Sequence, residues 1–253
     1  MSLKKIWNDQ YDGVKISSLK DINLFNKEVE SIISTSLNFI KKSKKKKLTI
    51  LELGCGSGEL IRRMDKIFIS KKLKCKFIGV DFSKKAINQA NSFSKKNQNF
   101  QCSDFLSYIK NLNSKSVDLV ITQRSIMAVM KKSDQKNILK EINRVLNIKG
   151  CGIFSECFVS GLIKFNKLRK IAKLNPIKKV WHSLYLLETT IEKIFDDVKY
   201  LDFCSTYMMI TRIIYPFFRE PIHNEKIHDI AFSLPNSGTN SFLKIAIVNK
   251  KKR

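Results

Sequence analysis

The sequence predicts an α/β domain built on a mostly parallel sheet with helices on both faces. Short apolar runs typical of buried strands alternate with segments whose apolar residues recur at helical spacing. This alternation is typical of strand–helix–strand units. A glycine-rich turn follows the first apolar run, and an acidic residue lies at or near the end of each of the first three. A chain of 253 residues is long enough for one such domain.

Composition narrows the class of protein. The formal net charge is +26, carried mostly by lysines spread along the whole chain, which favours a generally basic surface. Binding to nucleic acid or to an anionic membrane is the alternative interpretation. The six cysteines form no C-x-x-C pair and only three histidines occur, so we expect no metal site. Because the sequence shows neither a membrane-spanning run nor a signal peptide, we expect a cytoplasmic protein.

The glycine-rich turn is the feature around which the chain is organised. A buried strand at 48–53 leads into Gly54, Gly56 and Gly58, and a helical pattern comes next. Glycines allow a ligand to approach the main chain closely, and the N-terminus of the next helix suits an anionic group. The G-x-G-x-G spacing differs from the G-x-G-x-x-G of dinucleotide-binding folds and disfavours a dehydrogenase.

Acidic residues lie at the ends of three successive strands. Glu52 lies near the end of the first, Asp81 ends the second at 75–81, and Asp104 comes directly after the third at 99–103. In an open parallel sheet these three ends share one edge, where ligands bind. A carboxylate in the position of Asp81 can accept both hydroxyls of a ribose, although Asp81 or Ser83 can instead cap the next helix.

Taken together, these motifs and the turn at 147–152 resemble the class I S-adenosylmethionine-dependent methyltransferases over residues 48–156. The turn departs from the usual Lys-Pro-Gly-Gly at Lys149 and Cys151. The resemblance implies a Rossmann-like, seven-stranded sheet, mostly parallel with a C-terminal antiparallel hairpin, and S-adenosyl-L-methionine as cofactor. It implies the following cofactor-binding residues, the last two from a segment that closes over the cofactor: Glu52, Gly54, Cys55, Gly56, Gly58, Asp81, Phe82, Asp104, Phe105, Gln123, Trp7 and Tyr11.

We expect a single domain over residues 1–253. Residues 1–47 form an N-terminal cap and linker, 48–158 the cofactor-binding core, and 159–253 the substrate lid and C-terminal hairpin, with an insertion at 211–240. Helical spacing predicts helices at 21–40, with Asp21 as the N-cap, and at 84–93, 133–146, 162–172 and 188–195. Further β-rich runs predict strands at 117–122, 152–158, 198–209 and 241–248.

The residues after the fourth strand bear on the methyl acceptor. The motifs of adenine N-methyltransferases and cytosine C5-methyltransferases are missing there. Six strings are similar to methyltransferases found among bacterial surface-polysaccharide genes: 123–125, 155–156, 168–170, 181–185, 205–207 and 234–236. This resemblance implies a small-molecule acceptor, a hydroxyl of a sugar, nucleotide sugar or glycan. The alternatives are an RNA or tRNA methyltransferase and a non-catalytic cofactor-binding subunit, and the oligomeric state stays open.

Transfer of a methyl group to a hydroxyl benefits from a general base, for which histidine is suited near neutral pH. His182 is the candidate, with a packing histidine as the alternative, and Glu156 is the rival base. Arg124 is expected either to bind an acidic group of the acceptor or to pair with Glu156. Trp181, Tyr185 and Tyr207 are the remaining candidate substrate contacts.

Overall fold

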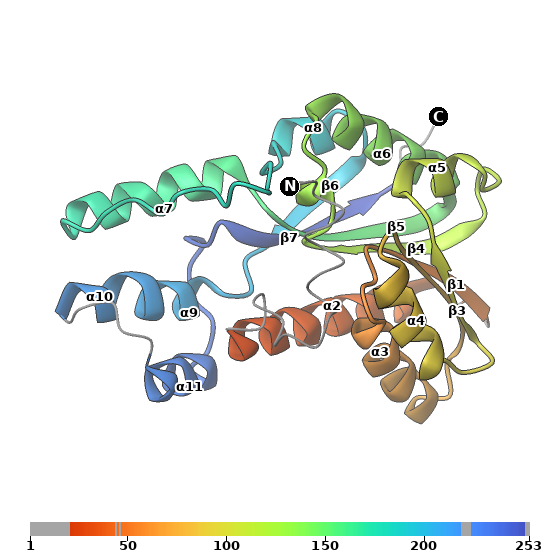
Figure 1. The fold of residues 1–253 in the computed structure, drawn as a ribbon, viewed down its shortest axis with the longest axis horizontal. Coiled ribbons are helices and arrows are strands. Elements are labelled where there is room, and N and C mark those ends of the chain that lie inside the picture. The colour runs from red at the N-terminus through yellow and green to blue at the C-terminus, as the bar shows by residue number, and fades with distance from the viewer. Residues whose placement is uncertain (1–20, 44, 46, 219–223, 251–253) are drawn as a thin grey trace.

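The computed structural model describes residues 21–43, 45, 47–218 and 224–250 and contains a seven-stranded sheet (Figure 1). The strand order is β3-β2-β1-β4-β5-β7-β6. Neighbouring strands from β3 to β5 pair in parallel, whereas β7 is antiparallel to both β5 and β6. The strands are β1 (Lys47–Leu53), β2 (Lys74–Asp81), β3 (Gln98–Cys102), β4 (Val117–Gln123), β5 (Leu146–Cys157), β6 (Asp196–Leu201) and β7 (Leu243–Asn249). The predicted fold class is confirmed.

Helices cover both faces of the sheet (Figure 1). One hydrophobic cluster joins the sheet to α2 (Ile22–Ser43), α3 (Glu59–Ser70) and α4 (Lys84–Ser92). A second cluster joins the opposite face to α5 (Phe105–Lys110), α6 (Lys132–Val145) and α8 (Glu188–Glu192). Alternation along β1 supplies both clusters, because Ile50 belongs to the first and Leu51 to the second.

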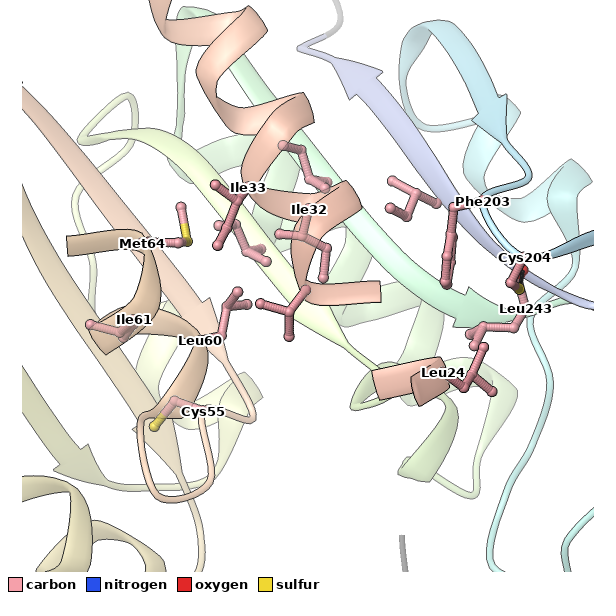
Figure 2. Packing of buried hydrophobic residues seen from close by; sticks show 14 of the residues in the cluster. Leu24, Ile32, Ile33, Cys55, Leu60, Ile61, Met64, Phe203, Cys204 and Leu243 are labelled. Atoms are coloured by element: carbon pink, nitrogen blue, oxygen red, sulfur yellow. Dashed lines mark hydrogen bonds between the residues drawn. The ribbon is translucent and has the colours of Figure 1, made fainter. Parts of the chain in front are cut away.

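Helix α2 forms where the sequence predicted it. The Asp21 carboxylate accepts a hydrogen bond from the Leu24 amide at 3.0 Å, which caps the helix N-terminus. Ile32 and Ile33 pack toward Leu60 of α3 in the first cluster, as Figure 2 shows. The buried face of α2 also carries a fully buried carboxylate, Glu28.

The segment after β5 is largely helical. Helices α7 (Val159–Ile171), α9 (Ser205–Met209), α10 (Tyr215–Phe218) and α11 (Glu225–Ser233) gather at one end of the molecule (Figure 1). A π-helical segment, η3 (Ile210–Ile214), joins α9 to α10.

The predicted strand at 198–209 is wrong beyond residue 201. The Asp202 carboxylate accepts hydrogen bonds from the amides of Cys204 (3.2 Å) and Ser241 (2.8 Å), and this turn ends β6. The chain then continues as α9, which buries Tyr207 and Met208. Two boundaries also differ, since helix α8 ends at Glu192 and the predicted turn at 147–152 is part of β5.

Candidate active site

The glycine turn links β1 to α3 at the carboxyl edge of the sheet. Gly54, Gly56 and Gly58 have φ of 79°, 51° and 78°, in the left-handed region that glycine enters without strain. A Cβ on Gly54 would lie 2.3 Å from Cβ of Ser125. The turn therefore needs glycine for its backbone conformation and, at residue 54, for its packing against the loop after β4.

Asp81, at the end of β2, connects that strand to the turn. Its Oδ2 accepts a hydrogen bond from the Gly56 amide at 3.0 Å, and its Oδ1 accepts one from the Ser83 amide at 2.9 Å. Ser83 itself caps α4, since its Oγ accepts from the Ala86 amide. Burial raises the pKa of Asp81, although the backbone donors oppose that shift.

Glu52, near the end of β1, is a buried carboxyl group with spare hydrogen-bonding capacity. It is 2% exposed, and its Oε2 has no hydrogen-bond partner among the residues that the structure describes. Burial, together with the charge of Asp81, raises the pKa of Glu52 to about 8, against an opposing effect of Arg62. A buried acceptor without a donor is costly to the fold, so a ligand that donates a hydrogen bond there would be stabilised.

Asp104 lies at the third strand end, after β3. Its Oδ1 caps α5 by accepting from the Ser107 amide at 3.1 Å, while the residue stays exposed. Phe105 beside it is 7% exposed, Phe82 after β2 is half-buried, and Cys55 in the glycine turn is buried. The parallel pairing of β1, β2 and β3 places their carboxyl ends along one edge, as predicted.

The loop after β4 is organised by Glu28, a residue that was not predicted from the sequence. Its Oε1 accepts from the Ser155 hydroxyl at 2.5 Å and its Oε2 from the Gln123 amide side chain at 3.0 Å. The Arg124 Nε lies 3.1 Å from the same Oε2. Thus Arg124 pairs with Glu28 rather than with Glu156, and both predicted site residues of this loop are held by α2.

Glu156 of β5 holds the next part of the same loop. It is fully buried, and its two oxygens accept hydrogen bonds from the amides of Ser125, Ile126 and Met127 at 3.0–3.2 Å. Burial raises the pKa of Glu156 to about 7, although these donors oppose the shift. Both oxygens are engaged in fixing the loop, so this geometry disfavours Glu156 as a base that contacts an acceptor.

The segment carrying His182 is attached to that loop. The Leu184 amide donates to the Met127 carbonyl at 2.7 Å, and the Gln135 side chain donates to the Leu184 carbonyl at 2.7 Å. His182 is half-buried, with its ring edge-on to Trp181 at 5.3 Å between centroids. Trp181 is 67% exposed. His182 and Trp181 therefore lie on a segment fixed beside the carboxyl end of β4.

Tyr185 and Tyr207, the other two candidate substrate contacts, are buried inside the protein. Tyr185 is 4% exposed and stacks on Phe242 with an interplanar angle of 15°. Tyr207 is fully buried, and its hydroxyl bonds to the Asp21 carboxylate and to Nδ1 of His228. Arg212 donates to the other Asp21 oxygen at 2.7 Å. Neither His228 nor Arg212 was predicted from the sequence, and Asp21 was predicted only as a helix cap.

Two predicted cofactor contacts, Trp7 and Tyr11, lie outside the described residues. Within the described residues, there is no group of three or more histidine, cysteine or acidic side chains placed to hold a metal ion. Of the helices in the same part of the chain, none is long and apolar enough to cross a membrane.

The family model described as a methyltransferase domain matches residues 44–210, which include β1 to β6 and the whole carboxyl edge of the parallel strands. The chain belongs to this methyltransferase family. Methyltransferase activity is therefore the function of the domain, and S-adenosyl-L-methionine is the cofactor that membership of the family implies.

Solved structures show the same fold at low sequence identity. The N-methyltransferase NodS of Bradyrhizobium japonicum, in complex with S-adenosyl-L-homocysteine, superposes with a TM-score of 0.61 at 11% identity over 100% of both chains. Magnesium protoporphyrin IX methyltransferase of Synechocystis, also with bound S-adenosyl-L-homocysteine, superposes with a TM-score of 0.57 at 15% identity over 98% of this chain and 94% of that one. A chain from the complex of the Haloferax volcanii Trm112 activator with a methyltransferase superposes with a TM-score of 0.61 at 10% identity. The match covers 97% of this chain and 98% of that one.

Proposed function

We propose that this methyltransferase binds S-adenosylmethionine across the carboxyl ends of β1, β2 and β3 and methylates a hydroxyl of a sugar-like small molecule. The observation that carries the cofactor part of the proposal is the row of carboxyl groups Glu52, Asp81 and Asp104 around the glycine turn, and the acceptor part rests on Trp181 and His182 beside the loop after β4. Asp81 suits the two ribose hydroxyls, and the exposed carboxylate of Asp104 suits an adenine amino group. The unpartnered Oε2 of Glu52 suits a donor on the cationic part of the cofactor.

The cofactor supplies a methyl group already activated by its positive sulfur. The protein then has to align the acceptor and to exclude water. Glu28 and Glu156 support alignment, because they fix residues 123–127 at the rim of the site. The 2.7 Å hydrogen bond from the Leu184 amide to the Met127 carbonyl attaches the segment that holds His182 to these fixed residues.

His182 is the proposed general base. Its imidazole can accept a proton from an acceptor hydroxyl only in its neutral form. The exposed indole of Trp181 beside it offers a flat apolar surface on which one face of a sugar ring can pack. Arg124, held at Glu28, is proposed to orient a polar group of the acceptor.

The acceptor class is tested by incubating the protein with methyl-labelled cofactor and separate pools of nucleotide sugars, glycans and RNA. We expect label in a sugar-containing pool. Label confined to RNA would contradict the acceptor proposal while leaving the cofactor site intact.

His182 is tested with His182→Ala and His182→Asn. We expect turnover to fall about a hundredfold or more, the usual contribution of a general base, with unchanged cofactor affinity. A protonated imidazole cannot act as the base, so we expect the wild-type rate to fall in acid and the rates of both variants not to show this fall. Equal turnover from pH 6 to 9 in wild type and variants would exclude His182 as the base.

A further inference from the structure

Helix α7 has a basic and apolar outer side that the methyltransferase site does not use. Ile163, Lys164, Lys167, Lys170 and Ile171 are exposed, and helical periodicity places all five on one side of the helix. We call these five residues the α7 surface. Ile163 is 55% exposed and Ile171 is 80% exposed, so two large aliphatic side chains are mixed with three lysines.

The opposite side of α7 is firmly packed. Leu162 and Phe165 are buried, and the Phe165 ring lies edge-on to Phe242 at 5.6 Å. Asn166 exchanges hydrogen bonds of 2.9 and 3.0 Å with the backbone of Ile177, which holds the returning chain against the helix. The exposed isoleucines therefore project from an ordered support whose own apolar side is already buried.

Positive charge is concentrated along this segment. Residues 159–187 contain seven lysine or arginine residues and no aspartate or glutamate. Elsewhere acidic residues are interspersed with the lysines, since the whole chain contains 22 of them. The segment therefore attracts anions over its whole length.

Two further aromatic side chains lie at the same end of the molecule. Phe217 and Phe218 of α10 are 56% and 74% exposed, with rings 5.0 Å apart. Figure 1 shows α10 beside the C-terminal end of α7, and Arg169 of α7 donates to the Arg212 carbonyl of η3, just before α10. Helical periodicity places Arg169 on the side of α7 opposite to the α7 surface, so Phe217 and Phe218 lie at the same end of the molecule but are not part of that surface.

We propose that the α7 surface binds reversibly to an anionic lipid bilayer. Lysines attract anionic headgroups, and exposed isoleucine side chains gain free energy by entering the boundary between headgroups and acyl chains. Nucleic acid fits this surface less well, because aliphatic side chains such as Ile163 and Ile171 gain little from phosphate groups. This proposal does not depend on the identity of the methyl acceptor.

The test is co-sedimentation of the full chain with phosphatidylcholine vesicles, with and without about one part in three of phosphatidylglycerol. We expect binding to the anionic vesicles and little to the neutral ones. Replacing Lys164, Lys167 and Lys170 by Gln should weaken binding about tenfold or more. The double replacement Ile163→Ser and Ile171→Ser should weaken it by a similar factor.

Matched controls change the same residue types on other surfaces. One combines Ile69→Ser and Ile148→Ser, which are 54% and 62% exposed. The other combines Lys66→Gln, Lys76→Gln and Lys96→Gln. Both should bind anionic vesicles like the wild type, and all variants should retain the wild-type circular dichroism spectrum.

Three outcomes would overturn the proposal. The first is no binding of the wild type to anionic vesicles, and the second is an equal loss in the control variants. The third is tighter binding to polyuridylic acid than to the vesicles, unaffected by the apolar replacements, which would identify a nucleic-acid surface instead.

Discussion

Two regions of the same sheet edge use buried carboxyl groups in different ways. At the ends of β4 and β5, Glu28 and Glu156 accept hydrogen bonds from protein donors on all four oxygens. At the end of β1, Glu52 keeps an oxygen without a partner in the described part of the chain. The first region is therefore built to hold its own shape, whereas the second keeps capacity for a ligand.

The largest effect should come from Glu28. Glu28→Ala removes the partner of Arg124, Gln123 and Ser155 and should lower the free energy of unfolding by about 3–5 kcal/mol, because it breaks an ion pair whose carboxylate is fully buried and leaves two further donors without their acceptor. Urea unfolding measures this. Glu30→Ala, on the exposed side of the same helix, is the control and should change it by less than about 0.5 kcal/mol. Equal stabilities for the two variants would show that Glu28 does not hold the loop.

The next effect concerns Asp81 and ligand binding. Asp81→Ala should weaken S-adenosylhomocysteine binding about ten- to a hundredfold, because a hydrogen bond to a charged group contributes about 1.5–3 kcal/mol. Calorimetry measures the affinity. Asp81→Asn retains an oxygen that can accept from the Gly56 amide, so it separates loss of the turn from loss of the charge. Wild-type affinity in both variants would remove the ribose assignment.

The smallest effect, counted per pH unit, is the dependence of stability on pH through Glu52. Its pKa is raised from 4.5 to about 8, so the folded state favours the protonated form. Its contribution to stability is complete below the unfolded pKa and is lost as the pH rises through 8. Without ligand, stability should fall between pH 5 and 8 by up to about 1.4 kcal/mol per pH unit.

Glu52→Gln should flatten this part of the profile, since glutamine does not titrate. Urea unfolding of both proteins at several pH values measures the difference. Glu156, with a pKa raised to about 7, adds a fall of the same sign that remains in the variant. Parallel profiles for wild type and variant would show that Glu52 is ionised in the folded protein and would remove the contrast with Glu156.

The sequence predicted the parallel part of the sheet because its signals are local. Apolar runs such as 48–53 and 75–81 define strands, and the glycine spacing and the acids that follow place their ends. The strand predicted at 198–209 failed because apolar residues after Asp202 suit a strand and a short buried helix equally. The bonds from the Cys204 and Ser241 amides to Asp202 decide between them.

The part of the site missed from the sequence depends on contacts between distant residues. Glu28 gave a signal, because a carboxylate lies between Leu24 and Ile32 on the apolar side of a helix. Its partners Gln123 and Ser155 are 95 and 127 residues away, so no local pattern identifies them. The contact of Asp21 with Tyr207 spans 186 residues, so no local pattern predicts it either.

The cofactor site itself is best tested by a crystal structure of the protein with S-adenosylhomocysteine. We predict that the ligand lies over the glycine turn, with its ribose hydroxyls on Asp81 and its adenine beside Asp104 and Phe105. Density for the ligand at any other place, with the carboxyl ends of β1 to β3 free of it, would contradict this assignment.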